Sequence, residues 1–144
     1  MNREEIKKIL PHREPMLLVN EAEVTGAGTA RGSYTVTGQE WFLQGHFPHS
    51  PVVPGVILCE MMAQACCVLL ANIQQEGRHT PYFTSLEKVK FRHPVKPGDT
   101  LHTECEIVRS KPPFYFAQAS ATVNGRVVVS AHFSFALVEN AQQG

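Results

Sequence analysis

The stretch that decides the fold is VILCEMMAQACCVLLA, residues 56–71. Its residues are apolar on all sides apart from Glu60 and Gln64, which is typical of a helix buried all round rather than of an amphipathic surface helix. At the helical rise this stretch is about 24 Å long, and it falls short of the ~20 apolar residues that a bilayer crossing needs. The stretch therefore predicts a central helix of a folded domain and no membrane span.

Segments on both sides of this helix have the patterns of β-strands. Before it, two strands are expected at 16–24 and 29–37, joined by a turn at Gly26 and Gly28. After it, four strands are expected over 82–91, 101–108, 114–123 and 127–138. The last two flank Asn124-Gly125, the dipeptide most typical of a two-residue hairpin turn. The prediction is an α+β fold in which a curved, mostly antiparallel sheet surrounds one apolar helix.

The chain length and the N-terminal residues bound the remaining organisation. At 144 residues the chain predicts a single domain over 1–144. Asn2 followed by Glu5 resembles a capping box, so a short N-terminal helix is expected before Pro11. A single helix covered by one curved sheet leaves strand edges open, and such edges usually pair with a second copy. At least a homodimer is therefore predicted.

The charge and cysteine content exclude several classes of protein. Thirteen basic residues balance thirteen acidic ones, so no overall field attracts nucleic acid or an anionic membrane. Four cysteines lack the C-x-x-C spacing of zinc or redox motifs and are expected to be small buried apolar residues. The N-terminus has no apolar region typical of a secretory signal, which favours a reducing, cytoplasmic location.

The segment before the helix, GHFPHSPVVPG at 45–55, places a histidine on a stiff backbone. Pro48, Pro51 and Pro54 restrict the backbone and disfavour helix, so His46 is held on an extended segment suited to catalysis. A hydrogen-bonded loop histidine is the alternative, since residue type alone does not decide the role. A metal site built from His46, His49 and Glu60 is disfavoured because a third close ligand is missing.

Glu60 is unusual because it lies in an apolar helix. An ionised carboxylate in such surroundings costs several kcal/mol, and the usual escape is to keep the proton. A carboxyl that stays protonated at neutral pH can act as a general acid. Pairing with a cation is the alternative, but no Arg or Lys occurs between Leu43 and Ile73. Gln64 lies four residues on, on the same helical face, where it could orient the carboxyl.

Gly55 is expected at the start of the helix, where unpaired backbone amides attract negative charge. Without a side chain, its amide can approach an oxygen closely. A base, an oxyanion donor and an acid would thus occur within one short stretch. These are the groups needed to remove a proton next to a carbonyl while a β-hydroxyl leaves.

The stretch GHFPHSPVVPGVILCEMMAQ, residues 45–64, resembles a known family signature, G-H-F-P-x-x-P-x-x-P-G-x-x-x-x-E-x-x-A-Q. That signature is typical of the β-hydroxyacyl-acyl carrier protein dehydratases of bacterial fatty acid synthesis, which have the hot-dog fold. Three further segments are similar to this family, LPHREPMLLVN at 10–20, YFTSLEKVKFRHPVKPGD at 82–99 and ATVNGRVVVSAHFSFAL at 121–137. His49 and Asn20 depart from the residues frequent at their positions, which loosens the substrate assignment but not the reaction.

The resemblance implies specific roles. His46 would be the base that takes the α-proton of a 3-hydroxyacyl thioester, and Glu60 the acid that protonates the departing hydroxyl. The amide of Gly55, helped by that of Val56, would polarise the thioester carbonyl, and Gln64 would support Glu60. The resemblance further implies that the acyl tunnel or its gate includes Phe47, Met61 and Tyr82, with an ordinary strand aromatic as the alternative role for Tyr82.

The family resemblance also implies the partners. No cofactor is expected, because the substrate is carried on the phosphopantetheine arm of acyl carrier protein. In this family the histidine and the acid of one site come from different protomers, so a homodimer or a trimer of dimers is implied. Carrier protein is acidic, and a local basic cluster that could receive it is formed by Lys88, Lys90, Arg92 and Lys96, with a solvated strand face as the alternative.

Two other functions remain open from the sequence. A hot-dog acyl thioesterase would use a carboxylate as nucleophile or base and would not obviously need His46. A non-catalytic hot-dog subunit could bind acyl chains, but it would have no reason to carry a costly buried acid. The preferred chain length depends on how Phe42, Met61, Met62 and Leu69 pack, and the sequence alone does not predict it.

Overall fold

The structure is a computed structural model, and it describes residues 1–44, 49, 51–72 and 79–139. The helices are α1 (Arg3–Ile6), the 3₁₀ helix η1 (Trp41–Leu43), α2 (Gly55–Cys67) and the 3₁₀ helix η2 (Val68–Asn72). The strands are β1 (Glu21–Gly26), β2 (Thr29–Thr35), β3 (His79–Phe91), β4 (Thr100–Lys111), β5 (Phe114–Val123) and β6 (Arg126–Glu139).

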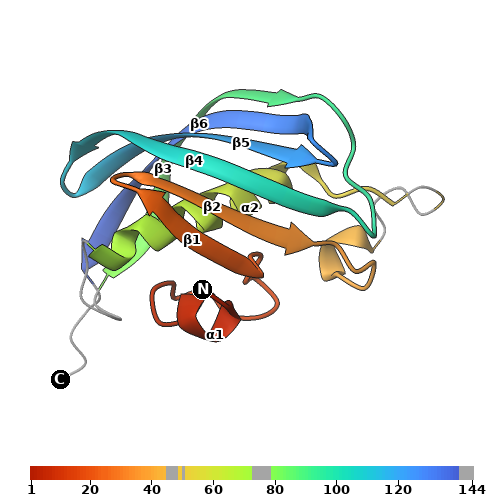
Figure 1. Cartoon of the computed structure of the whole chain (residues 1–144), viewed down its shortest axis with the longest axis horizontal. Coiled ribbons are helices and arrows are strands. Elements are labelled where there is room, and N and C mark those ends of the chain that lie inside the picture. The colour runs from red at the N-terminus through yellow and green to blue at the C-terminus, as the bar shows by residue number, and fades with distance from the viewer. Residues whose placement is uncertain (45–48, 50, 73–78, 140–144) are drawn as a thin grey trace.

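Within the described residues, the strands form one six-stranded sheet in the order β1-β2-β4-β5-β6-β3. Every neighbouring pair is antiparallel. Figure 1 shows the sheet curving over α2, with α1 beside β1. This arrangement is the hot-dog fold, so the α+β prediction of a curved antiparallel sheet around one apolar helix is confirmed.

The core lies between α2 and the sheet. Most side chains of α2 are buried, including Met62 and Cys66, which have no exposed surface. Gly32 of β2 lets the helix approach closely, because a Cβ at this position would lie 2.7 Å from the Cβ of Ala65. The predicted helix is confirmed, although its last turn tightens to the 3₁₀ helix η2 after Cys67. None of the described helices is both long and apolar enough to cross a membrane.

The predicted strand at 16–24 is wrong in its first half, because β1 begins only at Glu21. The backbone of the preceding residues is used elsewhere: the Met16 carbonyl and the Leu18 amide are both hydrogen-bonded to the side chain of Gln64. The Leu18 amide has a single N–H group, so it cannot donate to Gln64 and to a strand ladder at the same time. The polar helix residue therefore converts an apolar, strand-like segment into a loop that lies against α2.

Three local predictions are confirmed. Asn124 and Gly125 form the turn between β5 and β6, with positive φ values of 51° and 78°; positive φ at both central residues is what a type I′ hairpin turn requires. At the N-terminus, Asn2 caps α1 and exchanges hydrogen bonds with Glu5 in a capping box. The four cysteines are also buried and free, as expected of small core residues.

The two edges of the described sheet are β1 and β3. The edge strand β3 is 13 residues long and contains Pro81, a residue that sheets tolerate at an edge. Several large apolar side chains of β3 are exposed: Tyr82, Phe83, Leu86 and Phe91. A long edge with exposed apolar side chains is a surface on which another strand can pair.

Candidate active site

Glu60 lies in the middle of α2 and is only partly covered. Its side chain is 21% exposed, whereas the flanking Cys59 and Met61 are buried. One carboxylate oxygen, Oε1, accepts a hydrogen bond of 3.2 Å from Nε2 of Gln64. The same oxygen lies 3.6 Å from Nε2 of His12. Gln64 therefore holds this oxygen by a hydrogen bond, and His12 faces the same oxygen from slightly further away.

Gln64 is almost fully buried, with 1% of its surface exposed. Its Oε1 accepts a 2.7 Å hydrogen bond from the Leu18 amide, and its Nε2 donates to the Met16 carbonyl at 2.8 Å. Together with the bond to Glu60, these contacts use both ends of the amide. The side chain thus ties the helix to the loop before β1 and, at the same time, orients the carboxyl.

His12 is a member of this cluster that the residue-by-residue reading of the sequence did not single out. It comes from the loop after α1, far from α2 in the chain, and its side chain is 22% exposed. Its Nδ1 is buried and has no hydrogen-bond partner among the described residues. The similarity of the segment 10–20 to the family was the available signal, but no spacing rule places a loop histidine against a glutamate that lies 48 residues further on.

A small cavity of about 30 Å³ lies beside the carboxyl. Its lining combines the polar cluster with apolar side chains from the helix and the sheet: His12, Glu60, Ala63, Gln64, Cys67, Pro81, Phe83 and Phe135. Burial, followed by the nearby charge of Glu60, raises the pKa of the Cys67 thiol. Cys67 is therefore a neutral wall residue and not a nucleophile. Glu60 is the acidic side chain of this lining.

Gly55 and Val56 lie at a different place, in the first turn of α2. Pro54 is the N-cap residue and offers no side-chain cap, and the amides of Gly55 and Val56 have no acceptor within the described part of the chain. Val56 is 72% exposed. Gly55 lines a groove of about 460 Å³ beside Phe91. This turn can donate N–H groups to an oxygen, but it does not line the cavity at Glu60.

The structure separates the remaining predicted site residues. His46 and Phe47 lie outside the described residues. Tyr82 is 55% exposed on β3, and Met61 is buried in the core; neither belongs to the lining of the Glu60 cavity. Their roles in a tunnel or gate stay predictions. What the described residues bring together is the acid, its predicted support Gln64, and His12.

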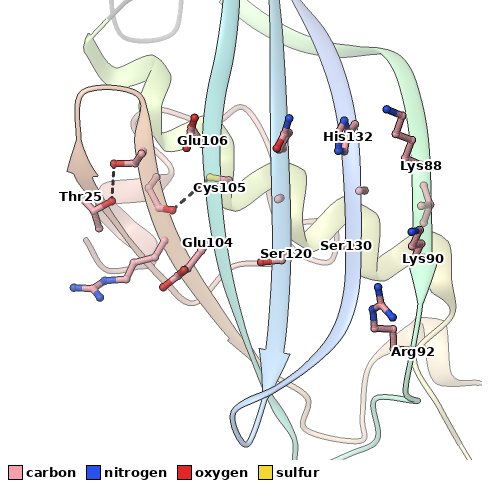
Figure 2. A pocket seen from close by; sticks show the side chains of 17 residues that line it. Thr25, Lys88, Lys90, Arg92, Glu104, Cys105, Glu106, Ser120, Ser130 and His132 are labelled. Atoms are coloured by element: carbon pink, nitrogen blue, oxygen red, sulfur yellow. Dashed lines mark hydrogen bonds between the residues drawn. The ribbon is translucent and has the colours of Figure 1, made fainter.

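The predicted basic cluster is exposed. Figure 2 shows Lys88 and Lys90 on β3, with Arg92 just beyond, on one side of a hollow of about 840 Å³. Glu104 and Glu106 project from β4 across this hollow. Lys96 is also exposed and lies in the turn before β4. In the described part of the chain none of these four cations forms an ion pair, so their charges are free to meet a partner.

Residues 10–132 match the family model of the FabA-like domain. The chain belongs to the FabA-like family. Its relatives include the 3-hydroxyacyl-[acyl-carrier-protein] dehydratase FabZ of Clostridium perfringens strain SM101, which is 43% identical over 137 residues that cover 95% of this chain and 99% of that protein. The FabZ dehydratase of Bacillus subtilis strain 168 is 39% identical over 140 residues, or 96% and 99% of the two chains.

A solved structure supports the fold of this FabA-like chain. The dehydratase heterocomplex ApeI:P from Xenorhabdus doucetiae has a chain that superposes with a TM-score of 0.80, covering 92% of this chain and 90% of that one. The sequence identity is 18%, so this likeness concerns the fold. For metals, the described residues contain no group of three or more His, Cys, Asp or Glu side chains that could hold an ion.

Proposed function

We propose that the chain is a dehydratase of 3-hydroxyacyl thioesters carried by acyl carrier protein, with Glu60 as its acid and His46 as its base. Curated relatives that align along nearly the whole chain have this activity in their names. The observation that carries the assignment of the acid is the held carboxyl: Glu60 borders a cavity with one oxygen fixed by Gln64. A general acid needs such a fixed position toward its substrate.

The reaction follows from the chemistry of the groups. His46 removes the proton from the carbon next to the thioester carbonyl. The electron pair of that C–H bond moves toward the carbonyl, whose oxygen gains negative charge and accepts hydrogen bonds from the amides of Gly55 and Val56. Glu60 gives its proton to the β-hydroxyl as the C–O bond breaks. Water leaves, and the electron pair forms the double bond of the trans-2-enoyl thioester.

The separation between Glu60 and the first turn of α2 supports a site shared between two copies. Gly55 lines the groove beside Phe91, whereas Glu60 lines the cavity beside Phe83. The family resemblance implies that His46 and Glu60 of one site belong to different protomers. The exposed apolar residues of the edge strand β3 are a suitable surface for a second copy. The proposed assembly is at least a homodimer, with a trimer of dimers as the larger form.

The acyl group in this proposal is delivered on the phosphopantetheine arm of acyl carrier protein, and no other cofactor takes part. The surface for this acidic partner is formed by four cations that make no ion pair within the described residues, Lys88, Lys90, Arg92 and Lys96. Phe47, Met61 and Tyr82 would border the path of the acyl chain. A cytoplasmic location accompanies this role in fatty acid synthesis.

The test uses the reverse reaction, the hydration of a crotonyl thioester, followed by the loss of enoyl absorbance. Glu60→Gln and His46→Ala should each lower kcat by about 10²–10⁴-fold, the usual contribution of one acid or base. His102→Ala and Glu106→Gln change the same residue types at exposed positions on β4, and both should stay within a few-fold of the parent chain.

Two results would contradict the proposal. If both Glu60→Gln and His46→Ala stay within about tenfold of the parent, the expected loss of acid–base catalysis is missing. If free thiol is released from an acyl thioester without reversible change at the double bond, the chain is a thioesterase.

A further inference from the structure

The hydrogen-bond polarity around Glu60 can be derived without locating hydrogens. The Leu18 backbone amide is always a donor, so the Gln64 atom that lies 2.7 Å from it must be the oxygen. The other end of the Gln64 amide, which contacts the Met16 carbonyl and Glu60, is therefore the NH₂ group. Gln64 donates to Oε1 of Glu60, and that oxygen is an acceptor.

His12 lies against the same oxygen. Its Nε2 is 3.6 Å from Oε1, slightly too long for a hydrogen bond. A small movement of either side chain would bring the two atoms within hydrogen-bond distance. The other oxygen, Oε2, has no hydrogen-bond partner among the described residues. Two nitrogen-bearing side chains thus converge on one oxygen and leave the second one open.

Stability alone does not explain a histidine at position 12. Its Nδ1 is buried without a partner among the described residues, and a buried polar atom without a hydrogen bond destabilises the folded state. An apolar side chain would avoid that penalty. In the neutral ring, protonation at Nε2 points the N–H group toward the carboxyl and leaves Nδ1 as a bare lone pair.

We propose that His12 is a positioning residue for the acid: with Gln64 it holds Oε1 of Glu60 as the acceptor oxygen, so that the transferable proton sits on Oε2. Gln64 donates to Oε1 at 3.2 Å and His12 Nε2 faces the same oxygen at 3.6 Å, so a proton on Oε1 would compete with these N–H groups, whereas a proton on Oε2 would not. Oε2 is then the oxygen that gives its proton to the β-hydroxyl. This inference rests on the proposed function and assigns His12 no contact with the substrate.

The experiment first removes the N–H donor of His12 and then restores a hydrogen-bond donor at the same position. His12→Phe keeps a planar ring but has no N–H, and it should lower kcat for crotonyl thioester hydration by about 10- to 100-fold, as misplacement of a catalytic group does. KM should change less than about threefold, because binding contacts are retained. His12→Gln offers an amide donor at a similar reach and should recover kcat to within about fivefold of the parent. His102→Phe, the same change at an exposed position on β4, is the matched control.

A double-mutant cycle separates positioning from a merely structural role. If His12 acts through Glu60, adding His12→Phe to Glu60→Gln should lower kcat by less than about twofold further. Should His12→Phe fail to fold, as judged by circular dichroism, His12→Met fills the same space with a flexible apolar chain and takes its place in the cycle.

The inference is overturned if the apolar variant stays within about threefold of the parent, if His12→Gln is as impaired as the apolar variant, or if the loss is the same in the Glu60→Gln background. Failure of the proposed function looks different: Glu60→Gln itself would then remain active. A chain in which Glu60→Gln is inactive and His12→Phe is fully active would disprove the role of His12 alone.

Discussion

The first turn of α2 and the middle of α2 differ in how many of their polar groups have partners within one copy of the chain. In the middle, Gln64 is buried and bonded to two backbone groups of the loop before β1. In the first turn, Val56 is 72% exposed and Gly55 borders an open groove. The same helix therefore carries an acid whose supporting side chain is fully hydrogen-bonded, and a first turn whose amide donors have no partner among the described residues.

The difference has a simple physical origin. The first amides of any helix lack partners inside the helix, so they stay available for a ligand. A residue in the middle of a helix has its backbone satisfied and can contribute only its side chain. Glu60 and Gln64 do so, and their positions depend on contacts with a distant loop. The amide end depends on helix geometry, whereas the acid depends on tertiary hydrogen bonds.

The largest effect should come from removing the hydrogen bonds of Gln64 in the middle of α2. Gln64→Leu removes the partners of the Leu18 amide, in a buried hydrogen bond, and of the Met16 carbonyl, in a partly buried one. Each unsatisfied buried group costs about 1–3 kcal/mol, so we expect a loss of about 2–4 kcal/mol in the free energy of unfolding. Because the carboxyl loses its donor, kcat should also fall by about 10- to 100-fold. Urea unfolding and steady-state kinetics measure the two effects.

Gln118→Leu is the matched control, because Gln118 is exposed on β5. Exposed substitutions away from special features usually change stability by less than about 0.5 kcal/mol. If Gln64→Leu were as mild as this control, the loop would not depend on the helix for its hydrogen bonds, and the contrast between the two parts of α2 would be wrong.

The sequence predicted the apolar helix and the hairpin better than it predicted the hydrogen bonds between Gln64 and the loop before β1. The helix followed from its uninterrupted apolar composition, and the last hairpin followed from Asn124-Gly125; both are local signals. The expected strand at 16–24 began too early because a side chain of α2 takes up the backbone groups of Met16 and Leu18. A hydrogen bond between residues 46 positions apart leaves no periodic pattern in the sequence.

The first turn of α2 can be tested by adding a methyl group at Gly55. A Cβ at Gly55 would lie 2.7 Å from Cζ of Phe91, so Gly55→Ala should force that ring to move. Overpacking in a core costs about 1–3 kcal/mol, but the Phe91 ring is 55% exposed and can turn aside, so we expect a loss of only about 1 kcal/mol. The backbone amide is kept, and Gly55→Ala/Phe91→Leu should therefore recover both the free energy of unfolding and kcat. Thermal unfolding and hydration kinetics of the two single variants and the double variant provide the check.

Partial recovery in the double variant would show which property of Gly55 matters. If the double variant recovers stability but not kcat, the absence of a side chain at Gly55 matters for the approach of the substrate oxygen as well as for packing. If neither is recovered, the clash with Phe91 is not the reason for glycine at the start of α2.

The residues around the acid were also only partly predictable, because only some of them differ from their sequence neighbours in polarity. Glu60 stands out because it is charged within an apolar run, and Gln64 because it lies one helical turn away on the same face. His12 carries no such local contrast, since it lies in a polar loop. Its contact with Glu60 exists because the hydrogen bonds of Gln64 hold that loop against α2, and surface ion pairs with Arg3 and Lys7 only add to the stability of the loop.

The smallest effect should come from those ion pairs. Glu14 of the loop contacts Arg3 at 2.9 Å and Lys7 at 3.1 Å. A hydrogen bond from its own backbone amide, followed by those from Lys7 and Arg3, lowers the pKa of Glu14 from 4.5 to about 2. A lowered pKa in the folded state means that this contribution to stability is present above about pH 4.5 and is lost as the pH falls toward 2.

Glu14→Gln should therefore lower the melting temperature slightly at pH 7, and the difference from the parent should shrink steadily between pH 4.5 and 2. The kcat at pH 7 should stay unchanged, because the buried bonds of Gln64 hold Met16 and Leu18 independently of the surface charges. Glu4→Gln removes a carboxylate that also contacts Lys7 but does not touch the loop, so it controls for the loss of charge alone. A fall in kcat with Glu14→Gln and not with Glu4→Gln would mean that the surface ion pairs, rather than Gln64, position the loop that carries His12.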